Sequence, residues 1–160
     1  MKKTGSILLI LTLCLSLLAA CGKKEVKNPD MADVVSAVDQ AIGNTGDMLV
    51  RDEDYVSGFM KIDVSKLSAY TVKTNSVGVS IDEYGVFQAA DSGSVKTLKE
   101  SVDAYLQMRV DTWMTEYMPE EQPKLLSAQV WTEGNYVMYA ILGDTTREAA
   151  STAFSSCFAG

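Results

Sequence analysis

The sequence predicts an α+β fold: a four-stranded antiparallel sheet with helices packed on it, in the order αββαββα, preceded by a cleaved lipoprotein signal peptide. Two pairs of short strand-like segments are each joined by a polar, glycine-containing segment. Segments with the apolar period of a helix precede, separate and follow these pairs. A short apolar run near the N-terminus, behind two lysines, has the form of an export signal.

The first helix of the domain is predicted to begin at Met31. Apolar residues recur with helical spacing as far as Ile42, between Asp30 as the N-cap and Gly43 as the residue that stops the helix. Residues 43–66 have no clear period: a loop-like GNTGDM segment and an acidic run precede a stretch that fits either a short helix or an irregular cover. This part of the chain is therefore left without a defined element.

Four segments have the composition of strands and are bounded by polar residues: 67–73, 83–89, 128–132 and 136–142. The segment TNSVGVSID joins the first two, and Glu133-Gly134-Asn135 is a hairpin signal between the last two. Adjacent strands joined in this way are antiparallel, which gives the predicted sheet.

The longest helix is predicted to follow Asp91. Its stripe advances in steps of three and four residues through Val95, Leu98, Val102, Leu106, Arg109, Trp113 and Tyr117. Only Arg109 interrupts the apolar pattern, and its stem can lie along apolar surface while the charge reaches water. Pro119 is expected to end the helix, the segment PEEQPK to be a polar connector, and a final helix to follow Asp144.

The last predicted strand is apolar on both faces. Residues 136, 138, 140 and 142 form one apolar set, and residues 137, 139 and 141 form the other. A strand of this kind requires cover on both sides. Either the first helix closes the second face of the sheet, or that face is a docking surface for a partner.

The N-terminal segment predicts a lipid anchor. Lys2 and Lys3 precede an apolar run over residues 7–18, shorter than the about 20 residues of a spanning helix. Leu18, Ala19, Ala20 and Cys21, followed by Gly22, resemble the bacterial lipobox, in which the thiol accepts a diacylglyceryl group. The alternative is an ordinary secretory signal with a chance cysteine. We expect a signal peptide at 1–20, a polar tether at 21–29 and one globular domain at 30–160, held on the extracytoplasmic face of the cell membrane.

Charge and composition limit the partners and the chemistry. Loss of Lys2 and Lys3 with the signal would change the formal charge from −7 to −9, so nucleic acid is not an expected partner. The expected partners are the membrane, through lipidated Cys21, and an envelope protein. The chain has no histidine, which excludes serine-histidine and cysteine-histidine mechanisms and histidine-based metal sites. No catalytic residue, metal or cofactor is expected.

A binding surface is predicted where the two hairpins bring polar and aromatic residues together: Asp82, Glu83, Tyr84, Asn135, Tyr136 and Tyr139. Tyrosine and asparagine suit recognition because they combine contact area with a hydrogen-bonding group. The structural alternative is that these tyrosines pack in the core and that Gly134-Asn135 is ordinary turn chemistry.

Several short motifs resemble an uncharacterised family of Gram-positive bacterial lipoproteins over residues 30–158: Asp82-Glu83, Val86-Phe87-Gln88-Ala89, Pro119, Gly134-Asn135-Tyr136 and Asp144. The resemblance implies a shared fold and a lipoprotein address, and it implies no activity. Gly85 departs from the family, in which an apolar residue is usual, and suggests a bulge in that strand.

The expected function is therefore that of a membrane-anchored, extracytoplasmic lipoprotein that acts as a non-enzymatic binding or interaction module of the cell envelope. The alternative is a small-molecule sensor or carrier with a pocket between the sheet and the long helix.

Overall fold

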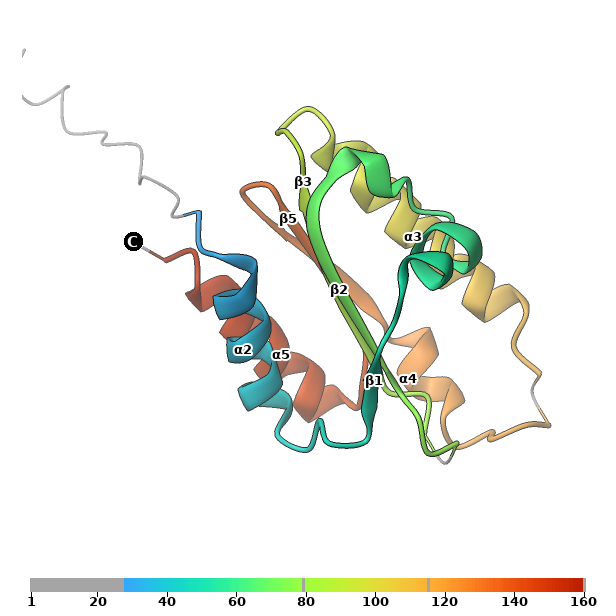
Figure 1. Ribbon diagram of the computed structural model, residues 1–160. Coiled ribbons are helices and arrows are strands. Elements are labelled where there is room, and N and C mark those ends of the chain that lie inside the picture. Colours follow the sequence, from blue (N-terminus) through green and yellow to red (C-terminus); the bar gives the residue numbers. More distant parts are fainter. Residues whose placement is uncertain (1–27, 79, 115, 160) are drawn as a thin grey trace, which may run out of the picture.

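The sheet contains five antiparallel strands in the order β1-β2-β3-β5-β4. The structure is a computed structural model that describes residues 28–78, 80–114 and 116–159 (Figure 1). The strands are β1 (Met48–Val50), β2 (Leu67–Asn75), β3 (Glu83–Ala89), β4 (Gln129–Glu133) and β5 (Tyr136–Ile141). The α+β class is confirmed, whereas the prediction of four strands is wrong.

The strand that the sequence did not predict is β1, at the edge of the sheet beside β2. Leu49 pairs with Thr74 and Val50 pairs with Lys73. β1 has three residues, of which Leu49 is 52% exposed and Val50 is 66% exposed. A segment so short and so exposed has no alternating pattern, and it becomes a strand because β2 offers a regular edge for pairing.

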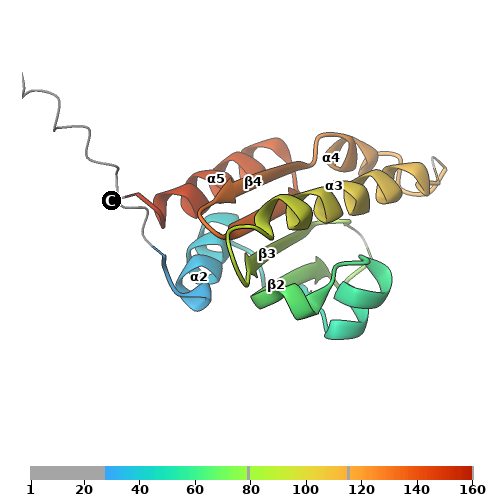
Figure 2. The same ribbon diagram turned by 90° about the horizontal axis from the view of Figure 1, so that it is seen from above.

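Helices cover both faces of the sheet (Figures 1 and 2). On one face, α2 (Met31–Ile42) and α5 (Asp144–Ser156) pack against each other. The other face carries α3 (Val95–Asp111), the short α4 (Gln122–Leu126), the π-helix η1 (Asp54–Phe59) and the 3-10 helix η2 (Val64–Lys66). The second sheet face is therefore covered by α2 together with α5, and the open docking surface considered as an alternative does not exist there.

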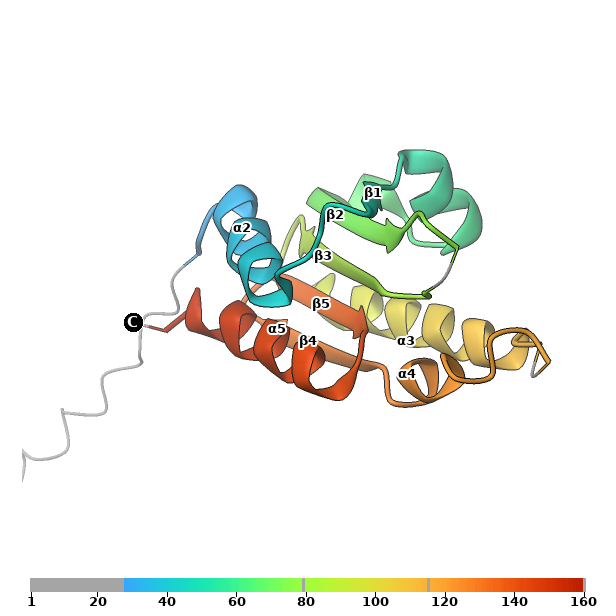
Figure 3. The ribbon, with the colours of Figure 1, turned by 90° about the horizontal axis from the view of Figure 1, so that it is seen from below.

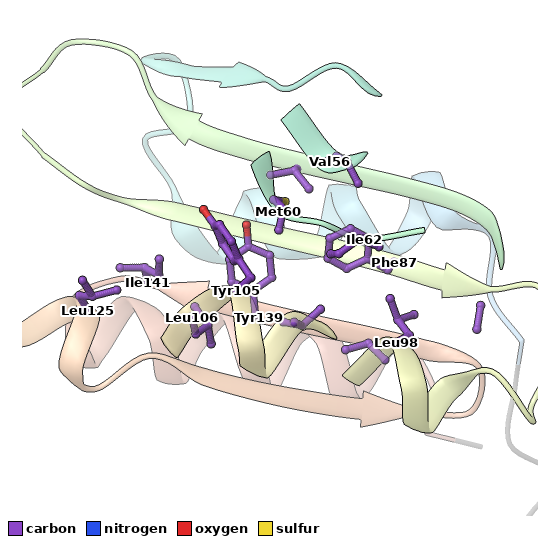
Figure 4. Close-up of a cluster of buried hydrophobic side chains, with 14 residues drawn as sticks. Val56, Met60, Ile62, Phe87, Leu98, Tyr105, Leu106, Leu125, Tyr139 and Ile141 are labelled. Atoms are coloured by element: carbon purple, nitrogen blue, oxygen red, sulfur yellow. The ribbon is translucent and has the colours of Figure 1, made fainter. Parts of the chain in front are cut away.

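The side chains of β5 alternate between two buried clusters. Val137, Tyr139 and Ile141 belong to the cluster beneath α3, called here the α3 core (Figure 4). Tyr136, Met138 and Ala140 belong to the cluster beneath α2 and α5, called the α2–α5 core. All six residues are 0% exposed, as expected for a central strand with helices on both sides.

The long helix ends earlier than its stripe predicts. α3 ends at Asp111, and Pro119 lies outside it. Of the two predicted stripe residues beyond this point, Tyr117 is 57% exposed, whereas Trp113 packs partly buried against the α3 core from outside the helix. Apolar periodicity predicts a helix reliably only where a second surface buries the stripe, and that condition is not met at Tyr117. The predicted connector also differs from expectation, because it contains α4 with a proline in its first turn.

Candidate functional site

The six residues predicted as a binding surface do not form one. Glu83 is 2% exposed, and Tyr84, Tyr136 and Tyr139 are each 0% exposed. Glu83 and Tyr139 face the α3 core side, whereas Tyr84 and Tyr136 belong to the α2–α5 core. Only Asp82 and Asn135 remain partly exposed. The alternation of side chains along a strand separates the residues, so the structural alternative of packed tyrosines is correct.

Glu83 is the centre of a buried polar cluster beneath α3. Its Oε1 accepts hydrogen bonds from the hydroxyl groups of Tyr105, at 2.6 Å, and of Tyr139, at 2.5 Å. Its Oε2 accepts a hydrogen bond from Nη1 of Arg109 at 2.6 Å. Figure 4 shows the two tyrosine rings side by side, with their hydroxyl groups directed to the same side. We call these four residues, with Tyr55, the Glu83 cluster.

Tyr55 extends the Glu83 cluster toward the surface. The hydroxyl oxygens of Tyr55 and Tyr105 are 3.1 Å apart, and Nη1 of Arg109 also donates to the Tyr105 hydroxyl at 2.7 Å. Tyr105 has one hydroxyl proton, which it donates to Glu83, so Tyr55 is the donor to Tyr105. The guanidinium of Arg51 lies over the ring of Tyr55, 5.0 Å from its centroid.

The tyrosines of the Glu83 cluster are held as neutral hydrogen-bond donors. Burial raises the pKa of Tyr105 and of Tyr139 above their usual values, and the negative charge of Glu83 raises both further. Burial lowers the pKa of Arg109, but the charge of Glu83 and the hydrogen bonds with Tyr105 and Glu83 together outweigh this effect, and the pKa of Arg109 lies above its usual value. The hydroxyl groups of Tyr105 and Tyr139 and the guanidinium of Arg109 therefore keep their protons across the physiological pH range.

Gly85 makes room for this arrangement on β3. It pairs with Tyr139 of β5, and a Cβ atom at Gly85 would overlap Cε1 of the Tyr139 ring. The pairing of β3 with both neighbours runs through Gly85 without a shift, so the predicted bulge is absent at this position. The glycine is required because an aromatic ring crosses its backbone on the way to Glu83.

Arg109 was singled out from the sequence as the one interruption of the apolar stripe, and its predicted role is wrong. Its guanidinium does not simply reach water but forms an ion pair with Glu83, and only 18% of its side chain is exposed. Tyr105 lies four residues before Arg109, on the same side of α3. A charged residue within an apolar stripe is a signal for a buried ion pair. Its partner, Glu83, could not be identified without knowing how β3 lies against α3.

Two further carboxylates connect elements outside the Glu83 cluster. Asp39 of α2 accepts hydrogen bonds from Tyr84 at 2.6 Å and from Lys73 at 2.7 Å, which attaches α2 to the sheet. Glu121 accepts hydrogen bonds from the backbone N–H of Ile81 at 2.9 Å and from Lys124 at 2.8 Å. Asp39 thus connects α2 to β2 and β3, and Glu121 connects the beginning of α4 to the segment before β3.

Glu121→Gln is expected to lower the free energy of unfolding by about 1.5–3 kcal/mol at neutral pH, because charged hydrogen bonds are lost. Burial raises the pKa of Glu121, but its hydrogen bonds with Lys124, Ile81 and Ser80 lower it to below the usual 4.5. A carboxyl whose pKa is lower in the folded state stabilises above the unfolded pKa and loses this effect as pH falls through the folded pKa. Urea unfolding at several pH values should show the two proteins converging in acid, and a difference that is constant with pH would contradict this account.

A groove lies beside the Glu83 cluster, between η1 and α3. It has a volume of about 440 Å³ and is lined by Gly58, Phe59, Met60, Lys61, Ser101, Ala104, Tyr105 and Met108. Tyr105 belongs both to the groove lining and to the Glu83 cluster. The sequence did not indicate this groove, because residues 43–66 had no period from which to place η1 against α3.

The predicted lipidation motif of Leu18, Ala19, Ala20 and Cys21 lies outside the described residues, as do the signal peptide and most of the tether. None of the described helices has both the length and the apolar composition required to cross a membrane. Within the same residues, no three His, Cys, Asp or Glu side chains are grouped so that they could hold a metal ion.

Comparison with known proteins gives one family match. The family described as a domain of unknown function, DUF4358, matches residues 40–142, which is more than half of the 160 residues. No curated protein and no solved structure matches the chain significantly. The match includes the motifs at 82–89, 119 and 134–136, is shorter than the predicted range 30–158, and assigns neither an activity nor a lipid anchor. The chain belongs to the DUF4358 family.

Proposed function

We propose that this protein is a lipid-anchored, extracytoplasmic domain that binds a component of the cell envelope without catalysing a reaction. The observation that carries the proposal is the order of residues before the domain: an apolar run over 7–18, then Leu18-Ala19-Ala20-Cys21 and Gly22. In this context Cys21 would receive two acyl chains. Each buried methylene contributes about 0.8 kcal/mol to membrane binding, so that two chains anchor stably where one does not.

The arrangement of the described residues is compatible with an anchor at this place. The chain enters the domain at α2, where the hydroxyl of Tyr136 donates to the carbonyl of Pro29 at 2.6 Å. η1 lies at the far end of the molecule from the beginning of α2 (Figure 3). The groove between η1 and α3 would therefore remain accessible when the residues before Pro29 are held at a membrane.

The Glu83 cluster supports a non-enzymatic role. A general base needs an oxygen that can reach a substrate proton. Glu83 is 2% exposed, and both of its oxygens already accept hydrogen bonds from protein donors. A carboxylate that is so fully occupied stabilises the fold and positions its neighbours, and it is not available to a substrate.

A small-molecule sensor or carrier is the second candidate, and the groove favours it. The sequence placed a pocket between the sheet and the long helix, and Val102, Tyr105 and Leu106 fill part of that space as members of the α3 core. The groove of about 440 Å³ lies instead between α3 and η1, and its volume is in the range typical of ligand sites, about 300–1,000 Å³.

Cys21→Ser is expected to abolish incorporation of a labelled fatty acid in growing cells, because serine has no thiol to form the thioether. Mass spectrometry of the protein without the substitution should find a mature N-terminus at Cys21 that carries diacylglycerol. Cys157→Ser is the matched control, since this cysteine lies after α5, and it should leave the label unchanged. A mature N-terminal peptide with an unmodified Cys21 would refute the anchor.

The envelope partner is tested separately from the anchor. A photoreactive side chain placed at Met108, in the groove lining, should crosslink in intact cells to a defined envelope component. The same group at Glu148, an exposed residue of α5, is the control and should not give this product. If both positions recover only bulk lipid, the proposed binding of an envelope component is wrong even when Cys21 carries its acyl chains.

A further inference from the structure

We propose that the groove between η1 and α3 binds a small anionic amphiphile, with its apolar part along Phe59 and Met108 and its negative group at Lys61. This inference rests on the proposed binding function and specifies the chemistry of the ligand. It depends on three features of the groove: its two walls, an incompletely buried aromatic side chain, and a single cation.

The two walls come from segments that are distant in the sequence. η1 and the residues after it supply Gly58 to Lys61, and α3 supplies Ser101, Ala104, Tyr105 and Met108. The α3 residues are three or four positions apart and therefore share one side of the helix. η1 is a π-helix, a rare element found frequently at functional sites. The groove is thus formed by regular elements and not by loops alone.

Phe59 gives the groove an apolar wall that the protein itself leaves incompletely buried. Its ring lies 5.1 Å from the ring of Tyr55 and 5.9 Å from the ring of Tyr105, measured between centroids. Phe59 is nevertheless 45% exposed, whereas the next residue, Met60, is 2% exposed. An apolar ligand in the groove would cover the exposed side of the ring, which is favourable because apolar surface leaves water.

Lys61 is the only charged side chain in the groove lining. Among the described residues, no carboxylate lies within 4.0 Å of its ammonium group as an ion-pair partner. The chain as a whole has 21 acidic and 14 basic residues, so a cation without an ion-pair partner beside an apolar groove is a local exception. Such a cation favours an anionic group on the ligand and disfavours a cationic one.

The size of the groove favours a small molecule over a protein surface. Stable protein interfaces bury about 800 Å² on each partner, much more than a groove lined by eight residues offers. A volume of about 440 Å³ has room for a single acyl chain or a small aromatic group with its anionic head. Dodecanoate is therefore a suitable probe, with 1-dodecanol and dodecylammonium as its neutral and cationic counterparts.

The test measures binding of the three probes by calorimetry, below their micellar concentrations, to the full chain carrying Cys21→Ser. Dodecanoate is expected to bind one per chain and more tightly than dodecanol, and dodecylammonium is expected to bind most weakly. Lys61→Met should lower the affinity for dodecanoate about fivefold, since a partly exposed ion pair contributes at most about 1 kcal/mol. The affinity for dodecanol should stay unchanged. Lys96→Met, at an exposed lysine of α3 outside the groove, is the matched control.

Ala104→Trp places a large side chain in the groove from an exposed position on α3. It should lower the affinities for dodecanoate and for dodecanol more than tenfold. Ser101→Trp is a second blocking variant if the first fails to fold, as judged by its unfolding temperature. Equal affinity for the three probes, an unchanged dodecanoate affinity in Lys61→Met, or binding that survives a folded blocking variant would overturn the inference. These outcomes leave the lipid at Cys21 and the crosslink from Met108 to an envelope component as independent results.

Discussion

Glu83→Ala is expected to lower the free energy of unfolding by about 3–5 kcal/mol, a large fraction of the about 5–15 kcal/mol that stabilises a typical domain. The substitution leaves the guanidinium of Arg109, which is 18% exposed, without its ion-pair partner. It also removes the acceptor of the Tyr105 and Tyr139 hydroxyl groups. Desolvated groups without partners cost more than the original contacts contributed, because water cannot replace the lost partner.

Two further variants separate the charge from the shape. Glu83→Gln keeps the size of the side chain and one acceptor oxygen but removes the charge, and we expect an intermediate loss of about 1.5–3 kcal/mol. In Glu83→Leu with Arg109→Met, both charges are absent, and the combined loss should be smaller than the sum of the single losses by at least about 1 kcal/mol. Urea unfolding measures all of them. If Glu83→Ala changes the stability by less than about 1 kcal/mol, the Glu83 cluster is not the buried network described.

Gly85→Ala is expected to destabilise the protein by about 1–3 kcal/mol, the usual effect of overpacking in a core. The added Cβ would overlap Cε1 of Tyr139 and would lie 3.1 Å from Cε2 of Phe87. Gly85 lies in β3, between β2 and β5, so the backbone cannot move away without disturbing a neighbouring strand. The ring of Tyr139 must move instead, which also weakens its hydrogen bond with Glu83.

The matched control is Gly58→Ala, because a Cβ at Gly58 would have no neighbour within 4 Å. It should leave the stability unchanged or raise it slightly, since alanine reduces the entropy of the unfolded chain. Tyr139→Leu should relieve the overlap, so that Gly85→Ala costs less in that background than in the original protein. Equal losses from Gly85→Ala in the two backgrounds would show that Tyr139 is not the reason for the glycine.

The candidate site shows where sequence reasoning failed. Glu83 and Tyr139 were selected, but as parts of a surface, because their burial depends on a helix that packs on them from elsewhere in the chain. Arg109 was noticed as an interruption of an apolar stripe, and its partner is 26 residues away in the sequence. The groove beside Tyr105 was not predicted, since η1 is a π-helix and its residues lack the apolar period of an α-helix or a strand.

Elements whose side chains repeat with a clear period were readable from the residue order. α2 occupies its predicted residues from Met31 to Ile42, β3 matches its predicted bounds, and β5 alternates between the two cores as its apolar sets required. The apolar period of a segment depends only on its own residues, and it indicates which side of the segment is buried. The lipid anchor at Cys21 belongs to the same kind of inference and stays a prediction.

Long-range contacts settled the rest. β1 exists because β2 pairs with it, α3 stops at Asp111 although its stripe continues, and Glu83 becomes a buried ion because Arg109 and two tyrosines reach it across the α3 core. None of these three features can be predicted from the residues that are adjacent in the sequence. They follow from which surfaces meet after the chain has folded, and a buried charge in particular is tolerated only where partners from distant segments arrive together.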